Sequence, residues 1–408
     1  MSTIESELRP IPRVPLWRNV RVLRIVAQIV AVGIVGSILY RLFDNLTTNL
    51  EDVGISTDFG VLRRPANFAV RDDPGFDIQS PVVPNLMWIG VKNTLMSAFV
   101  GIAIAVVLGT LIGIGRLSTN WLVQKICTVY VETLRNIPPL VIIIFFGFAV
   151  FTYGPFPIFN PRNPPWQVKV PGTDDNLLIL SNERWGFPSA MKDGNVGIFW
   201  ILMLVAAIAA GVVWWWRTQV NVRTGASHHR VALSTATLLG LGLVAFLALG
   251  NPYRMSWPAV SDSGRTILGG FGTNSGYLSI TLALGLYHAS HVAEIVRGSI
   301  MAVARGQSEA ANALALSGFQ RYRFVVLPQA AKIASPPVIS QFLSLTKNTS
   351  LATVVAYPEI ASLTASTIAN GMPAVQMLVL LMALYLTISL TWSLILNLVS
   401  RRFKEVGR

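Results

Sequence analysis

Long uncharged stretches alternate with short charged ones along most of the chain. A helix that crosses the hydrocarbon core of a bilayer needs about 20 predominantly apolar residues. The stretches from Asn93 to Gly115, Gly194 to Trp216, Val231 to Tyr253 and Thr266 to Ala293 hold no charged residue and meet this length. With the less regular apolar segments added, the pattern predicts eight spans: 24–43, 91–115, 124–152, 196–216, 230–250, 277–302, 333–357 and 373–400.

Composition supports a membrane protein, and the basic residues predict its orientation. Charged residues make up 12% of the chain and hydrophobic residues 52%, whereas soluble domains contain about 25% charged residues. Lysine and arginine are in excess in the segments expected on the cytoplasmic side, and the long loops 44–90 and 152–195 lack that excess. The bias predicts that both termini are cytoplasmic. It also accounts for the net charge of +13 without a nucleic-acid partner, since no basic soluble domain is present.

A polar, basic segment from Gly306 to Ala330 separates the sixth and seventh predicted spans. We expect two short helices, with Ser308 as N-cap and Glu309 in the first turn of the first helix. Gly318 is expected to end that helix in left-handed geometry, and Pro328 to end the second. From the residues alone, two interpretations fit equally: a hairpin that docks into a groove of another protein, and an amphipathic segment lying on the membrane surface.

The same segment resembles the "EAA" cytoplasmic loop of ATP-binding-cassette (ABC) importer permeases, whose pattern is E-A-A, three residues, G, nine residues, I-x-L-P. Glu309, Ala310 and Ala311, then Leu327 and Pro328, stand at the matching offsets, and Ala315 replaces the glycine. The segments "YVETLRNIPPL", "HVAEIVRGSI" and "LTKNTSLATVVAYPEI" resemble the polar amino-acid (histidine/glutamine/arginine) permeases, and among these the general L-amino-acid and glutamate/glutamine/aspartate permeases. The resemblance covers about residues 88–400, with an insert at about 155–275 that adds two spans.

The resemblance implies an all-α integral membrane protein, the transmembrane subunit of a type I ABC importer in the bacterial cytoplasmic (inner) membrane. It implies a cytoplasmic segment 1–23, a first span and outer loop 24–87, the permease domain 88–400 and a cytoplasmic tail 401–408. The implied partners are a cytoplasmic ABC ATPase dimer, a related second permease subunit, an extracytoplasmic amino-acid-binding protein and the lipid bilayer. The residues implied to contact the ATPase are Gly306, Glu309, Ala310, Ala311, Ala315, Gly318, Leu327 and Pro328.

The chain also lacks the nucleotide-binding loop G-x-x-x-x-G-K-[ST], because it contains no Gly-Lys pair. ATP hydrolysis is therefore expected in a separate subunit, and no cofactor or metal site is predicted. Soluble binding proteins usually determine the substrate in this family, so the carried amino acids stay open.

Two charged pairs at i, i+3 spacing, Glu132 with Arg135 and Glu294 with Arg297, lie inside predicted spans. Ionisable groups in a membrane usually face the bundle interior or a wet cavity. Straight spans would place both acids about 10–16 Å below the cytoplasmic boundary, each followed by a helix breaker at Pro138 or Gly298. Two alternatives stay open: the pairs contact the substrate, or they line a cavity and neutralise each other. The predicted substrate path comprises Glu132, Arg135, Asn136, Pro138, Glu294, Arg297, Lys347, Asn348, Thr349 and Ser350.

The competing hypothesis is an ion-coupled secondary transporter that acts without an ATPase. Such transporters usually contain inverted repeats with paired broken spans, and the two E-x-x-R segments match too briefly to establish a repeat. A membrane-embedded enzyme would need a nucleophile with a base or a metal cluster, and the sequence offers neither.

Overall fold

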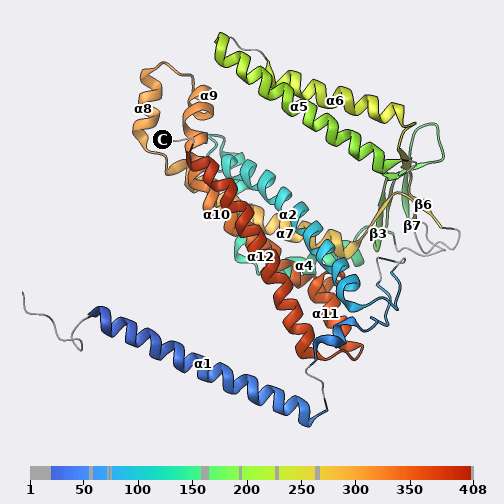
Figure 1. Cartoon of the computed structure of the whole chain (residues 1–408). Helices are drawn as coiled ribbons and strands as arrows, with labels where there is room; N and C mark the ends of the chain where they lie inside the picture. Colours follow the sequence, from blue (N-terminus) through green and yellow to red (C-terminus); the bar gives the residue numbers. More distant parts are fainter. Residues whose placement is uncertain are drawn as a thin grey trace, which may run out of the picture.

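The computed structural model describes residues 20–54, 58–70, 73, 76–157, 165–192, 195–225, 229–261 and 267–405. Long helices dominate these residues (Figure 1). The α-helices are α1 (Val20–Asp52), α2 (Met87–Gly115), α3 (Trp121–Asn136), α4 (Pro139–Ile144), α5 (Val196–Thr224), α6 (Arg230–Ala248), α7 (Ser275–Met301), α8 (Arg305–Ala313), α9 (Gly318–Arg321), α10 (Leu327–Asn348), α11 (Ile360–Ala369) and α12 (Ala374–Glu405). Short 3-10 or π-helical turns are η2 (Phe59–Arg63), η3 (Val82–Leu86), η4 (Phe145–Thr152), η5 (Tyr322–Val326) and η6 (Thr349–Val355).

Each of the eight predicted spans coincides with a helix or a bent helix pair. Among the described residues, five helices are long and apolar enough to cross a membrane alone, and up to seven spans result if each of two bent pairs counts as one. The remaining predicted span is α7. It falls outside this set because its serines, histidines and Tyr277 lower its hydropathy, and these groups are tolerated where they face the interior of the bundle.

The third predicted span is not straight. Helices α3 and α4 meet at an angle of 105°, because Ile137 precedes Pro138 and is extended (φ −97°, ψ 131°). Steric clash with a following proline disfavours helical geometry at such a residue. The straight third span assumed in placing Glu132 is therefore not present. In the seventh predicted span, α10 continues through Pro336 and Pro337, and the bend of 43° comes later, before α11.

Helix α7 forms the centre of the bundle and packs closely against α2 (Figure 1). The contact face of α2 holds a small residue at every fourth position, from Ser97 to Gly113. A Cβ atom on Gly109 would lie 2.6 Å from Cβ of Val292, and one on Gly113 would lie 2.6 Å from the carbonyl oxygen of Ala293. Two glycines four residues apart let helix backbones approach closely in a membrane.

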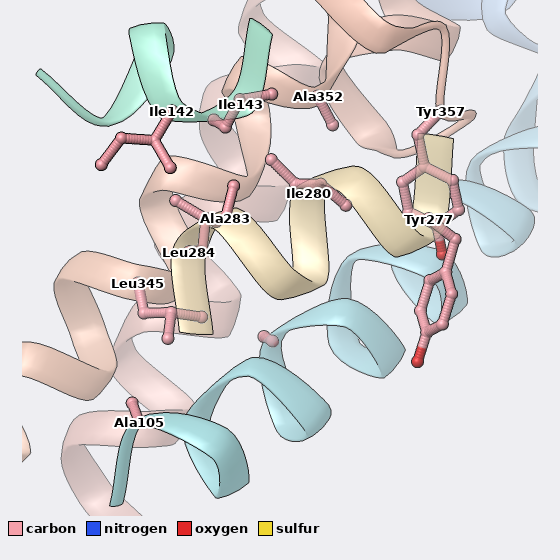
Figure 2. Packing of buried hydrophobic residues seen from close by; sticks show 11 residues of the cluster. Ala105, Ile142, Ile143, Tyr277, Ile280, Ala283, Leu284, Leu345, Ala352 and Tyr357 are labelled. Carbon is pink, nitrogen blue, oxygen red and sulfur yellow. The ribbon is translucent and has the colours of Figure 1, made fainter. Parts of the chain in front are cut away.

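An apolar core joins α7 to its neighbours. Figure 2 shows Ile280 and Leu284 of α7 among Ile142 and Ile143 of α4 and Leu345 of α10. Ala105 of α2, Ala352 of η6 and Tyr357 complete the labelled cluster together with Tyr277 and Ala283. This core connects the bent helix pairs to the central helix and therefore fixes where the breaks of those pairs lie.

The insert contains a helical hairpin and a small β-structure. Helices α5 and α6 pack mainly against each other. The described strands are β1 (Trp166–Lys169), β2 (Asn176–Leu180), β3 (Arg184–Phe187), β4 (Ser189–Lys192), β5 (Tyr253–Ser256), β6 (Ala259–Val260), β7 (Ile267–Leu268) and β8 (Phe271–Asn274). Antiparallel pairing gives a sheet β1-β2-β3-β8 and the pairs β4-β5 and β6-β7. Because β8 leads directly into α7, this sheet is attached to the central helix.

Helix α1 lies apart from the bundle (Figure 1), and none of its residues is buried. An apolar helix with no protein neighbour must be covered by lipid or by another subunit.

Candidate functional site

The segment 305–330 forms a helical hairpin at one end of the bundle, as the sequence predicted, but its helix boundaries differ. Helix α8 begins at Arg305, four residues earlier than expected, with Ala304 as N-cap and no side-chain cap. Ser308 therefore does not cap the helix, and Glu309 lies in its second turn, not its first. Glu309 and Ala310 are exposed, as is Gly306, whereas Ala311 packs inward.

The turn between the two helices is formed at Ala315. Its φ of +52° is left-handed, a geometry that glycine adopts readily and that costs other residues about 1–2 kcal/mol. Ala315 stands at the position where the motif has glycine, and its backbone adopts the left-handed geometry that glycine favours. Gly318 does not end α8: it is the first residue of α9, behind a capping box formed by Ser317 and Gln320.

The second helix of the hairpin runs directly into a membrane helix. The backbone stays helical from α9 through the π-helical turn η5, in which Leu327 N–H donates to the carbonyl oxygen of Tyr322, into α10, whose second residue is Pro328. Pro328 therefore does not end the helix, contrary to our prediction. Arg321 donates to Asn312 Oδ1 (3.1 Å) and Gln329 to Gln307 Oε1 (2.9 Å). These bonds hold α8 against the helix that continues into the bundle.

Large apolar side chains are exposed at the end of the hairpin. The exposed fraction is 75% for Leu314, 71% for Phe319 and 64% for Phe324. Arg323 lies over the rings of Phe319 and Phe324. Exposed apolar groups rimmed by polar residues are typical of an interaction site.

A cluster of three arginines surrounds one carboxylate where α2, α3 and α7 meet. Arg297 Nη2 lies 2.5 Å from Glu294 Oε1, so the predicted i, i+3 pair on α7 is present. Arg116, which follows α2, bonds to Glu294 Oε2, and Arg135 Nη1 of α3 lies 3.8 Å from the same oxygen. The exposed side-chain fraction rises from 12% for Arg116 to 42% for Arg135. The cluster is thus cationic, and Arg135 is its most accessible and most weakly paired member.

Two details of the predicted path were wrong. Glu132 and Arg135 form no ion pair in the described part of the chain: both are exposed, and Arg135 turns to Glu294 of another helix. Gly298 does not break the sixth span, since α7 continues to Met301.

The polar residues at the end of α10 face different surroundings. Lys347 is exposed, and Ser350 donates to its carbonyl oxygen (2.9 Å). Asn348 lies 3.3 Å from His288 Nε2, and Thr349 is buried. The structure thus places the predicted path residues in three groups: Arg135, Glu294 and Arg297 in the charged cluster; Glu132, Asn136 and Pro138 exposed beside it; Lys347, Asn348, Thr349 and Ser350 at the junction of α10 and η6.

Comparison with known protein families identifies this arrangement. Residues 101–405 match the family described as "Binding-protein-dependent transport system inner membrane component". The chain belongs to this family. The match includes the charged cluster and the hairpin, and it confirms the predicted class, a helical integral-membrane permease of the type I importer fold.

Three relatives of this permease match over most of its length. The chain is 34% identical to the "General L-amino acid transport system permease protein AapQ" of Rhizobium johnstonii, over 93% of this chain and 92% of that protein. It is 35% identical to the "Putative amino-acid ABC transporter permease protein YhdX" of Escherichia coli, over 97% and 96%. It is 32% identical to the "Glutamate/glutamine/aspartate/asparagine transport system permease protein BztB" of Rhodobacter capsulatus, over 93% of each.

Sequence reasoning missed a buried carboxylate in this permease. Glu359 is fully buried at the N-terminus of α11, where it accepts hydrogen bonds from the N–H groups of Ala361 (2.9 Å) and Ser362 (2.7 Å) and from the hydroxyl of Tyr385 (2.7 Å). The signal was present: Pro358 precedes an acid that stands directly before an apolar helix, which is the pattern of an N-cap. Since Glu359 caps α11 and Tyr385 belongs to α12, the hydrogen bond between them holds the two helices together.

Proposed function

We propose that the chain is the permease subunit of an ATP-driven importer of polar or general L-amino acids. The observation that carries this proposal is the likeness, over nearly the full length, to permeases whose names specify amino-acid transport. No observation on the described residues favours the ion-coupled alternative.

The hairpin α8–α9 would be the contact with a separate ATPase. Its exposed Leu314 and Phe319 offer apolar area for a groove, and Glu309 offers a carboxylate for a basic residue of the partner. Since α9 continues into α10, a movement of the hairpin would be transmitted to the junction of α10 and η6, near His288 and Asn348. This continuity favours docking over the membrane-surface alternative.

The charged cluster would hold the substrate carboxylate. Glu294 is already engaged by Arg116 and Arg297, so we assign it the role of holding the arginines in place. Arg135 keeps donors available for a charge-assisted contact to an incoming carboxylate. A substrate ammonium would then be held by groups outside this cluster.

The remaining partners follow from the family and its relatives. The family's description names a binding protein, which would dock on the side opposite the hairpin. Two permeases of one system, BztB and BztC of Rhodobacter capsulatus, both match this chain, which supports pairing with a related second permease. The protein would lie in the inner membrane, with the hairpin and both termini on the cytoplasmic side. The boundaries 24–87, 88–400 and 155–275 remain our proposed division of the chain.

The experiment compares uptake with and without an ATPase. The complete complex is reconstituted in liposomes. ATP is supplied on the side of the membrane where the ATPase lies, and uptake of a labelled L-amino acid from the other side is measured. We expect uptake only with ATP, ATPase and binding protein together. Uptake driven by an ion gradient without the ATPase would refute the proposal in favour of the secondary transporter.

A further inference from the structure

A cluster of tryptophans and arginines lies between the start of α6 and the part of α5 about two turns before its end. Arg217 Cζ lies 4.7 Å from the ring centroid of Trp216, and Arg230 Cζ lies 5.1 Å from that of Trp214. Trp214 belongs to α5 and Arg230 begins α6, so the second contact joins the two helices. Arg217 follows Trp214 by three residues and lies on the same face of α5. Two guanidinium groups are therefore held near one level of the hairpin.

These arginines lack an anionic partner within the described structure. The sequence contains no Asp or Glu between Val196 and Ser261, and neither Arg217 nor Arg230 makes an ion pair to another described residue. The Nε atom of Arg217 is buried and has no hydrogen-bond partner there. Guanidinium groups that have no carboxylate partner in the described structure favour an anionic acceptor from outside the chain.

The position of the cluster indicates which acceptor that is. Helices α5 and α6 are both long and apolar enough to span a membrane. The apolar run of α5 ends at Trp216, directly before Arg217, and tryptophans at such a boundary lie at the level of lipid headgroups. Basic pockets between spanning helices bind anionic headgroups. Arginine presents a planar fork of donors that matches a phosphate. In addition, the N-cap residue of α6, His229, makes no side-chain hydrogen bond to the helix. The backbone N–H groups in the first turn of α6, which begins at Arg230, are therefore left without a side-chain acceptor.

We propose that this cluster is a binding site for an anionic phospholipid, whose phosphate lies between Arg217 and Arg230. The tryptophan rings hold both guanidinium groups in place before the lipid arrives. The site would fix the insert in one leaflet, a role separate from transport, and it does not depend on the proposed function.

The test measures lipid binding to the purified full-length protein in detergent by native mass spectrometry. The probes are phosphatidylglycerol and phosphatidylcholine with identical acyl chains. We expect tighter binding of phosphatidylglycerol to the wild type. The double variant Arg217→Gln/Arg230→Gln should weaken that binding at least about tenfold, since each arginine near an anionic headgroup contributes roughly a factor of five.

Arg223 provides the matched control, because it lies on the same helix without a tryptophan contact. Arg223→Gln should weaken binding by less than about threefold. If the glutamine variant aggregates, Arg217→Lys/Arg230→Lys keeps both charges but loses the planar contacts, and a loss of about threefold is expected. Equal binding of the two lipids, unchanged binding by the double variant, or an equal loss with Arg223→Gln would overturn the proposal. Displacement of the lipid by inorganic phosphate would show a free-anion site instead.

Discussion

At the scale of single residues, Glu294 determines the properties of the charged cluster. It is the one carboxylate bonded to Arg116 and Arg297 in the described structure, and Arg135 stands 3.8 Å from it. Its removal would leave three arginines in mutual repulsion beside the end of α2, so a variant at Glu294 changes stability and function together. Arg135 is the better position at which to separate them, because it is half-exposed and weakly paired.

Arg135→Gln should raise the amino-acid concentration needed for half-maximal uptake at least about tenfold, at normal membrane levels. A charge-assisted hydrogen bond contributes about 1.5–3 kcal/mol, and 1.4 kcal/mol is a factor of about ten. Uptake titrations normalised to protein amount measure this. Glu132→Gln is the control, since Glu132 is exposed on the same helix and unpaired with Arg135; it should leave the concentration unchanged. An unchanged value for Arg135→Gln would exclude it from the substrate site.

Ala315 supports a second prediction at this scale. Ala315→Gly should stabilise the hairpin by about 1 kcal/mol, because glycine adopts the left-handed geometry without the steric cost. Ala310→Gly, inside α8, should destabilise the same helix by roughly 0.5–1 kcal/mol. Hydrogen–deuterium exchange of α8 amides should therefore slow in the first variant and accelerate in the second. Slower exchange in both, or faster exchange in both, would contradict the assigned turn.

At the scale of elements, the contact between α2 and α7 depends on residues that have almost no side chain. On α2, a small residue recurs at every fourth position from Ser97 to Gly113. This period is visible in the sequence. Hydropathy alone did not reveal it, because it measures apolar content and not side-chain size. Hydropathy predicted the existence and order of the spans. It did not predict that the chain turns by 105° at Pro138.

Gly109→Ala should lower the free energy of unfolding by about 1–3 kcal/mol, as overpacking does, because its Cβ would lie 2.6 Å from Val292 Cβ. A Cβ on Gly211 of α5 would meet no atom within 4 Å, so Gly211→Ala is the matched control. The melting temperature of the purified protein should fall for the first variant only. Equal melting temperatures would mean that the helices pack less closely than described.

At the scale of the whole molecule, β8 joins the small β-structure to the central helix α7 of the bundle. The motif spacing located the hairpin and the cluster acid Glu294 from the sequence. The sequence could not show that Arg116 and Arg135 converge on Glu294, since these residues come from three helices whose packing depends on long-range contacts. The strands were also missed, because each has five residues or fewer and so shows too short a pattern of alternating residues.

Removal of the α5–α6 hairpin tests whether the insert is peripheral to transport. Lys192 and Tyr253 are paired across β4 and β5, so an Asn-Gly turn can replace residues 193–252 with the strand twist preserved. The shortened chain should keep ATP-dependent uptake within about threefold of the wild type, since α5 and α6 pack mainly against each other. Loss of uptake in a shortened complex that assembles normally would place these helices in the transport mechanism.

Glu309→Lys is the sharpest test of our proposal that the α8–α9 hairpin couples this permease to an ATPase. The measurement is ATP-dependent amino-acid uptake by the reconstituted complex, together with the amount of ATPase that co-purifies. Charge reversal at an exposed docking carboxylate places like charges together, so uptake should fall at least about tenfold with unchanged membrane levels, while Glu309→Asp should retain activity. Wild-type uptake and a full complement of ATPase with Glu309→Lys would contradict the account.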